Sequence, residues 1–281
     1  MSEGVWHQLE TETKKIVPVQ LFKAEGAHQA TLLMLPALGI AARFYRRLAA
    51  GLAAQGIQTI VFEQRGHGES PYRAKRGAKF GFDAFLEEDI PAALAFAKQL
   101  AENTPLYLGG HSLGGHFSSI IAGRHPDGIE GVVQIACGFP YHGLYAGPPA
   151  KKIRTLCRLL PPVCFLLGYF PGQKIGFGGR EYRQLMLDWR DWALGGRYDY
   201  GKHTNIEGEI ALFGGRVLSI SFEKDFFASD EATEYSRTRL KGADQTALKL
   251  GRLEQGEHLG HFDWARKPDG VVETVSEWLK T

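Results

Sequence analysis

Short β-rich segments alternate with helical segments along the first half of the chain, and this alternation restricts the possible folds more than any other feature. The β-rich segments are 29–35, 59–62, 106–109 and 131–135, and the helical segments between them are 42–55, 82–99 and 114–124. Parallel neighbouring strands need crossover connections, which are usually helices. The order therefore predicts an α/β fold with a mostly parallel central sheet flanked by helices, and an active site beyond the carboxyl ends of the strands.

The alternation fails between about residues 140 and 205. This segment contains Pro148-Pro149, Pro161-Pro162, a Pro171-Gly172 turn and several aromatic residues. The rhythm then returns, with a strand at 216–221, a helix at 229–240, a strand at 248–253 and a final helix at 271–279. We therefore expect one core built from residues 1–139 and 206–281, with residues 140–205 as a mainly helical insertion.

The size and composition fit one large globular core. With 281 residues, 44% of them hydrophobic and 23% charged, the chain can bury roughly three quarters of its unfolded surface. The formal net charge of +2 gives no indication of a nucleic-acid partner. No stretch approaches the roughly 18 uncharged apolar residues of a transmembrane helix, and residues 1–15 lack the apolar core of a signal peptide.

The cysteines bear on the cellular compartment and on metal binding. Cys137, Cys157 and Cys164 are an odd number and lack metal-ligand spacing. In a chain of this size they fit reduced thiols better than a disulfide framework. We therefore expect a cytoplasmic protein without a structural metal ion.

A G-x-S-x-G motif carries the strongest chemical signal. The predicted strand at 106–109 runs into Gly110-His111-Ser112-Leu113-Gly114-Gly115, and a predicted helix follows. A serine at a sharp strand-to-helix turn needs small residues two positions to either side, because the backbone there is strained and tightly packed. A chain with 35 glycines can contain the motif by chance, but its place between a strand and a helix is the context that a nucleophile requires. Ser112 is therefore the predicted nucleophile, and His111 beside it is a predicted substrate contact.

A nucleophilic serine needs a base and an acid that orients the base. In folds with this type of turn, the three catalytic residues occur along the chain in the order Ser, then Asp or Glu, then His. His258 and His261 follow the late strand, and we favour His261 because Gly260 would let its loop approach the serine. Asp225 lies four residues past the strand at 216–221 and is the preferred acid, with Glu223 and Asp230 as competitors.

With these residues in this order, the chain resembles the α/β-hydrolase superfamily over nearly its whole length. The segment Phe62-Glu63-Gln64-Arg65-Gly66-His67-Gly68-Glu69-Ser70 is similar to the D-x-R-G-x-G-x-S turn of the superfamily, with Glu63 in place of the usual aspartate. That turn is structural in the superfamily. The resemblance therefore implies that His67 is not catalytic, although it can lie near the pocket.

The resemblance also implies an oxyanion loop. Leu35-Pro36-Ala37-Leu38-Gly39-Ile40 occupies the place of the H-G-x-x-G loop, and the donor there is a backbone N–H that any residue except proline can supply. We assign the two donors to Leu38, with Ala37 as the neighbouring option, and to Leu113. Residues 36–45 and the Trp189-Arg190-Asp191-Trp192 segment further resemble a bacterial group of predicted α/β-hydrolases that have been little characterised, which implies no substrate.

In the superfamily, an insertion at 140–205 implies a cap over the active site. A helix at 151–160 has apolar residues at helical spacing and is expected to end at Pro161-Pro162. The apolar run 163–170 either packs the cap onto the core or lines an acyl or alkyl pocket, with Phe165 and Leu166 as predicted substrate contacts. A basic helix beside an apolar run leaves contact with a membrane surface open. Trp189 and Trp192 share a helix face, which favours core packing.

The predicted activity is serine hydrolysis of a small ester-like molecule with an apolar acyl or alkyl group. The reaction passes through an acyl-serine and implies no metal and no organic cofactor. An acyltransferase or a thioesterase would use the same residues. A ligand-binding protein with a slow triad is an alternative of another class, because a fold alone does not imply a function.

Overall fold

A computed structural model describes residues 3–280, and in this range eight strands form one sheet in the order β1-β2-β4-β3-β5-β6-β9-β10. The strands are β1 (Val5–Glu10), β2 (Ile16–Phe22), β3 (Ala30–Leu35), β4 (Ile57–Phe62), β5 (Leu106–His111), β6 (Gly131–Ile135), β9 (Arg216–Phe222) and β10 (Asp244–Leu250). From β4 to β10 all neighbours pair in parallel, while β1 and β2 pair antiparallel. The predicted α/β fold is confirmed. The antiparallel strands β1 and β2 were not expected.

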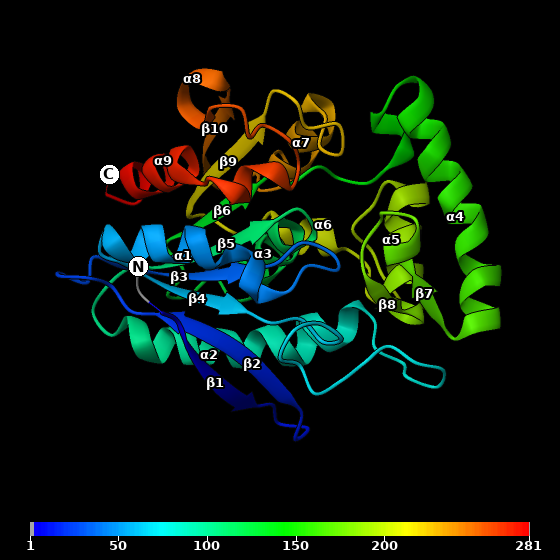
Figure 1. The fold of residues 1–281 in the computed structure, drawn as a ribbon, viewed down its shortest axis with the longest axis horizontal. Coiled ribbons are helices and arrows are strands. Elements are labelled where there is room, and N and C mark those ends of the chain that lie inside the picture. The colour runs from blue at the N-terminus through cyan, green and yellow to red at the C-terminus, as the bar shows by residue number, and fades with distance from the viewer. Residues whose placement is uncertain (1–2, 281) are drawn as a thin grey trace.

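Helices cover both faces of the sheet (Figure 1). One face packs on α1 (Arg46–Ala54) and α9 (Asp269–Lys280), and the other on α2 (Ile90–Ala101) and α3 (Leu113–Arg124). Strands β3 and β4 are buried along their whole length, as expected for strands covered on both sides. Alternate residues therefore enter different cores, with Leu33 of β3 on the α2–α3 side and Leu32 on the α1–α9 side.

Shorter elements complete the core. They are the helical turns η1 (Ala42–Tyr45), η2 (Ala84–Asp89) and η5 (Asp263–Arg266), and the helices α6 (Ile206–Ile210), α7 (Asp230–Arg237) and α8 (Arg252–Gln255). Strand β10 lies at the edge of the sheet and begins four residues before the predicted start at 248, while residues 252–255 form α8 instead of strand. Most of β10 is exposed or half-buried, so its side chains show little of the apolar pattern that marks the central strands.

Between β6 and β9 the chain leaves the sheet. It forms η3 (His142–Leu144), α4 (Gly147–Leu167), β7 (Tyr169–Pro171), η4 (Gly172–Lys174), β8 (Arg180–Tyr182) and α5 (Arg183–Gly195). Figure 1 shows α4 at one edge of the molecule, with α5, β7 and β8 close beside it. The boundaries at 140 and 205, and the role of this segment as a cap, stay predictions.

The expectation that Pro161-Pro162 ends a helix is wrong, because α4 continues through both prolines to Leu167. A proline inside a helix removes the hydrogen bond to the carbonyl four residues earlier. For Pro161 that carbonyl belongs to Cys157, and the Arg190 Nε of α5 donates a hydrogen bond to it at 2.9 Å. The packing of α5 thus compensates part of the cost of the first proline.

Two further observations bear on membranes and cysteines. In the described residues, no helix has the length and apolar character needed to span a bilayer. Cys137, Cys157 and Cys164 are buried and unpaired. The cytoplasmic location stays a prediction.

Candidate active site

Ser112 occupies the turn between β5 and α3 in a rarely adopted backbone conformation. Its φ is 52° and its ψ is −118°, outside the regions that most non-glycine residues occupy. The Ser112 N–H donates a hydrogen bond to the carbonyl of Ile135 on β6 at 2.9 Å. The next residue, Leu113, begins α3, and the first amides of a helix have no partner within the helix. The turn therefore presents a hydroxyl and an available N–H together.

The glycines of the motif are required by close packing. A Cβ added to Gly110 would lie 2.1 Å from the carbonyl carbon of Gly114, and one added to Gly114 would lie 2.2 Å from the carbonyl oxygen of Leu35. A Cβ on Gly115 would lie 2.7 Å from the Cys137 sulfur. Larger residues at these positions would force the strand and the helix apart. The strained turn at Ser112 depends on them.

Asp225 and His261 form a buried pair. The His261 Nδ1 lies 2.8 Å from the Asp225 Oδ2, and both side chains are almost completely buried. The other carboxylate oxygen, Oδ1, accepts hydrogen bonds from the N–H groups of Phe227 at 2.8 Å and Ala228 at 3.0 Å. The loop after β9 thus fixes the carboxylate, and the carboxylate in turn fixes the orientation of the imidazole.

His261 and Ser112 line the same pocket. In the described part of the chain, Ser112 Oγ forms no hydrogen bond with the His261 ring. Hydrogen bonds of this kind are often long in free enzymes and tighten when substrate binds. The arrangement can therefore bring a hydroxyl, a base and an orienting carboxylate together around one bound carbonyl.

The competing residues lie elsewhere. The His258 Nδ1 is 3.0 Å from the Asp263 Oδ2, away from Asp225. Glu223 and Asp230 are exposed, and Asp230 pairs with Lys249 at 2.8 Å. The reason given for preferring His261 is wrong, however. A Cβ on Gly260 would meet only Asp263, at 3.4 Å, so that glycine is not needed for a close approach.

The two predicted oxyanion residues, Leu38 and Leu113, both line the pocket. The neighbouring option is occupied, because the Ala37 N–H donates a hydrogen bond to the Tyr45 hydroxyl at 2.9 Å. The Gln64 Nε2 also donates to the Ala37 carbonyl at 2.7 Å and the Ile40 carbonyl at 2.8 Å. The loop before α1 is thus held on both sides of Leu38.

His111 does not reach the pocket, contrary to the predicted substrate contact. Its side chain points to the other side of β5, where it is completely buried. The Tyr45 hydroxyl, which accepts a hydrogen bond from the Ala37 N–H, also forms a hydrogen bond with the His111 Nδ1 at 2.9 Å. Burial, and to a lesser degree the neighbouring His261, hold the pKa of the His111 imidazole well below its ordinary value. A neutral His111 therefore packs behind His261, with 5.0 Å between the ring centroids.

The pocket has a volume of about 980 Å³ and mainly apolar walls. Apart from the residues above, the side chains from the insertion that line it include Lys151, Lys152, Ile153, Leu156, Leu159, Phe177 and Trp189, and those from the core include His116, Phe226, Phe227 and Phe262. Phe165 and Leu166, the predicted substrate contacts, do not line the pocket and are 66% and 68% exposed. They lie near the far end of α4, whereas its first half faces the nucleophile.

Several of these pocket residues were not expected from the sequence. Some of them directly follow a predicted catalytic residue: Phe226 and Phe227 follow Asp225, and Phe262 follows His261. This position in the sequence could have predicted that they line the pocket. His116 lies one helical turn beyond Ser112, and its Nδ1 is 2.8 Å from the Tyr198 hydroxyl. Burial lowers the pKa of His116 to about 4, so it is neutral near pH 7.

The turn at 62–70 is held by Glu63. Its carboxylate accepts hydrogen bonds from the N–H groups of Ala42 at 3.0 Å and Glu69 at 3.2 Å. A Cβ on Gly68 would lie 1.8 Å from the Glu63 Oε2. His67 faces the buried Glu181 at 3.2 Å and does not line the pocket.

Comparison with known proteins identifies the family of this chain. Residues 26–168, just over half of the chain, match the family described as serine aminopeptidase, S33. The chain belongs to this family of α/β-hydrolases. An uncharacterised abhydrolase domain-containing protein of Dictyostelium discoideum is 30% identical to this α/β-hydrolase over 286 residues. The match covers 97% of the chain and 27% of that protein, so the chain spans about a quarter of its relative.

Solved structures share the fold of this α/β-hydrolase. A highly thermostable carboxyl esterase from Bacillus coagulans has a TM-score of 0.72 at 11% identity, with 100% of this chain and 99% of that chain covered. Est1E from Butyrivibrio proteoclasticus, solved with ferulic acid, has a TM-score of 0.65 at 16% identity, with 98% and 96% covered.

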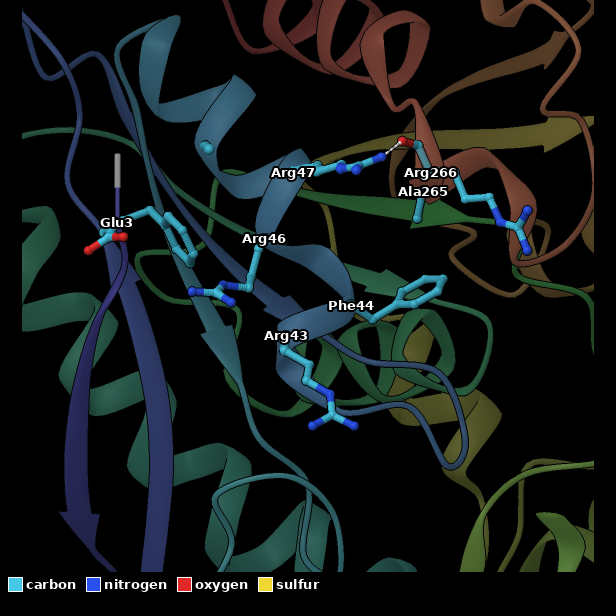
Figure 2. A pocket seen from close by; sticks show the side chains of 9 residues that line it. Glu3, Arg43, Phe44, Arg46, Arg47, Ala265 and Arg266 are labelled. Atoms are coloured by element: carbon cyan, nitrogen blue, oxygen red, sulfur yellow. Dashed lines mark hydrogen bonds between the residues drawn. The ribbon is translucent and has the colours of Figure 1, made fainter. Parts of the chain in front are cut away.

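A second hollow of about 760 Å³ lies beside η1 and α1 of the α/β-hydrolase. It is lined by Arg43, Arg46, Arg47 and Arg266, together with Glu3 and apolar residues. Figure 2 shows that the arginine head groups point in different directions, and Arg47 donates a hydrogen bond to the Arg266 carbonyl. The head groups do not converge on one point, so this hollow does not form a site for a single anion.

Proposed function

We propose that this α/β-hydrolase cleaves a carboxylic ester with an apolar acyl or alkyl group through an acyl-serine intermediate. The observation that carries the proposal is the meeting of Ser112, the Asp225–His261 pair and the residues Leu38 and Leu113 around one mainly apolar pocket. Esters with an apolar side chain fit such walls, because burial of each methylene contributes about 0.8 kcal/mol.

In the proposed mechanism, His261 removes the proton of Ser112 as the hydroxyl attacks the ester carbonyl. Asp225 holds the imidazole in the tautomer with a proton on Nδ1 and stabilises the imidazolium that forms. The N–H groups of Leu38 and Leu113 bind the oxyanion of the tetrahedral intermediate. His261 then protonates the leaving alcohol and activates the water that releases the acid.

The charge of the pocket favours an ester over the peptide substrates suggested by the family's description. Lys151 and Lys152 line the pocket, so a substrate with a free cationic α-amino group would meet like charge there. A neutral or anionic ester would not. A thioester or an acyl acceptor other than water would use the same residues, and product analysis distinguishes these reactions.

The test is a substrate panel on the purified full chain. We expect turnover of p-nitrophenyl esters, covalent labelling of Ser112 by a fluorophosphonate, and little release of p-nitroaniline from aminoacyl p-nitroanilides. Ser112→Ala should lose about 10⁴-fold or more of the esterase activity, because it removes the nucleophile. A variant that kept a tenth of wild-type activity would refute the assignment of Ser112. Labelling without turnover would favour the ligand-binding alternative.

A further inference from the structure

Basic residues are concentrated in two segments of the chain. Residues 71–82 and 147–180 together contain 10 of the 33 lysines and arginines and none of the 31 aspartates and glutamates. The rest of the chain has 23 basic and 31 acidic residues and is therefore net negative. The small overall charge hides this separation. A molecule with one strongly basic region and an acidic remainder is oriented by a negatively charged surface.

The two segments meet at one corner of the molecule. Arg76 in the loop 71–79 donates a hydrogen bond to the carbonyl of Leu166, near the end of α4. The Arg180 Nε of β8 donates to the Ala74 carbonyl of the same loop at 2.7 Å. In Figure 1 this loop and the end of α4 lie at the same edge of the molecule, away from the sheet. The loop, β8 and the end of α4 thus belong to one surface, whereas Lys151 and Lys152 lie near the start of α4 and line the pocket.

An exposed apolar tip lies within this basic surface. Phe165, Leu166 and Leu167 are 66%, 68% and 43% exposed, and they close α4 beside Arg76. Large exposed apolar side chains that lie together usually mark a site of interaction. The loop that Arg76 joins to the tip carries four exposed basic residues, Arg73, Lys75, Arg76 and Lys79.

The spacing along α4 separates the tip from a second group of charges. Arg154 and Arg158 are exposed and lie seven or more residues before Phe165, which is about 10 Å or more along a helix. Apolar side chains of surface-bound helices reach about 5–10 Å into the boundary between headgroups and acyl chains. With α4 upright on the membrane and the tip at that depth, Arg158 would lie at the level of the lipid headgroups and Arg154 just above it.

We propose that the end of α4 and the loop 71–79 form a docking surface for an anionic phospholipid membrane. The apolar tip inserts into the bilayer, and the surrounding lysines and arginines bind the phosphate and carboxylate groups of anionic lipids. A nucleic acid would match the charge but would leave the three exposed apolar side chains without a partner. The proposal is independent of the ester chemistry, because neither the apolar tip nor the loop 71–79 lines the pocket.

The experiment is sedimentation of the full chain with vesicles of phosphatidylcholine alone or of phosphatidylcholine with phosphatidylserine. We expect binding to the anionic vesicles that weakens as salt is added. The double variant Lys75→Glu, Lys79→Glu should lower the partition coefficient at least about 30-fold, since each basic residue near the surface contributes about 1 kcal/mol. Phe165→Ser with Leu166→Ser should lower it at least about 30-fold, because two large apolar side chains no longer enter the bilayer.

Control variants carry changes of the same kind outside the surface. Lys23→Glu with Lys241→Glu alters the net charge equally, and Leu253→Ser removes an apolar side chain that is 97% exposed on α8. Both controls should bind as the wild type does, and all variants should keep wild-type activity on a short soluble ester. Equal binding to both kinds of vesicle, equal losses in the controls, or binding to single-stranded DNA but not to vesicles would each overturn the proposal.

Discussion

At the residue scale, the separation of His258 from His261 is the sharpest test of the site. The two histidines are three positions apart, yet one pairs with Asp263 and the other with the buried Asp225. Asp225 is held by two backbone N–H groups in addition to the histidine, so it is a rigid acceptor. A rigid acceptor of this kind fixes one tautomer of its partner.

His261→Ala should therefore lose about 10⁴-fold in kcat/KM, while His258→Ala keeps most of the activity. Asp225→Asn should lose on the order of 10³- to 10⁴-fold, because the amide permits the wrong tautomer. The measurement is kcat/KM on one p-nitrophenyl ester for all three variants. An inactive His258→Ala beside an active His261→Ala would reverse the assignment, and an active Asp225→Asn would move the acid to Glu223 or Asp230.

At the scale of the element, α4 has two different ends. Its first half supplies Ile153, Leu156 and Leu159 to the pocket, whereas Phe165 and Leu166 near its last turn are exposed. We therefore expect the first half of α4, and not the run 163–170, to select the acyl chain. Leu156 is the natural position to test, because it is only half-buried and faces the pocket.

We expect the wild type to gain roughly fourfold in kcat/KM for each methylene added to the acyl chain, until the pocket is full. Leu156→Asp should flatten this dependence and leave acetyl-ester hydrolysis nearly intact, which also shows that the variant folds. Phe165→Asp is the matched control on the same helix and should keep the wild-type profile. A wild-type profile that is flat or falls from acetyl onward would exclude an acyl pocket.

At the scale of the whole molecule, Asp188 links the insertion to the core. This residue of α5 accepts hydrogen bonds from the Phe82 N–H at 2.8 Å and from the Gln184 Nε2 at 2.8 Å. Burial raises the pKa of the Asp188 carboxyl to about 6. An unfolded aspartate has a pKa of about 3.9, so the folded state binds this proton more tightly. The resulting stabilisation is present below about pH 4 and is lost as the pH rises through about 6.

Asp188→Asn cannot titrate and keeps an oxygen for the Phe82 N–H. Its free energy of unfolding, measured with urea, should therefore rise relative to the wild type by on the order of 1–3 kcal/mol between about pH 4 and pH 7. Asp191→Asn on the same helix is the control, because its side chain is 57% exposed. Wild-type and Asp188→Asn stabilities that stay parallel over this range would contradict the raised pKa.

The central sheet, the turn at Ser112 and the chain order of the candidate triad could be predicted because they depend on short-range features. Buried parallel strands are continuously apolar over a few residues, and the glycines around Ser112 are needed within the turn itself. Strand β1 was not predicted, and β10 was predicted with the wrong bounds. Both strands are largely exposed and lack that pattern.

Neighbouring residues thus decide the order of the core elements and the strained turn, so both can be predicted from local patterns. The direction of a side chain depends instead on packing between segments that are far apart in the chain. His111 follows the pleat of β5 away from Ser112, and the contacts of α4 with the core decide which of its residues face the pocket. The Cys157 carbonyl, which Pro161 leaves without its partner in the helix, accepts a hydrogen bond from Arg190, 33 positions further along the chain. Such outcomes depend on partners distant in sequence, and no local pattern encodes them.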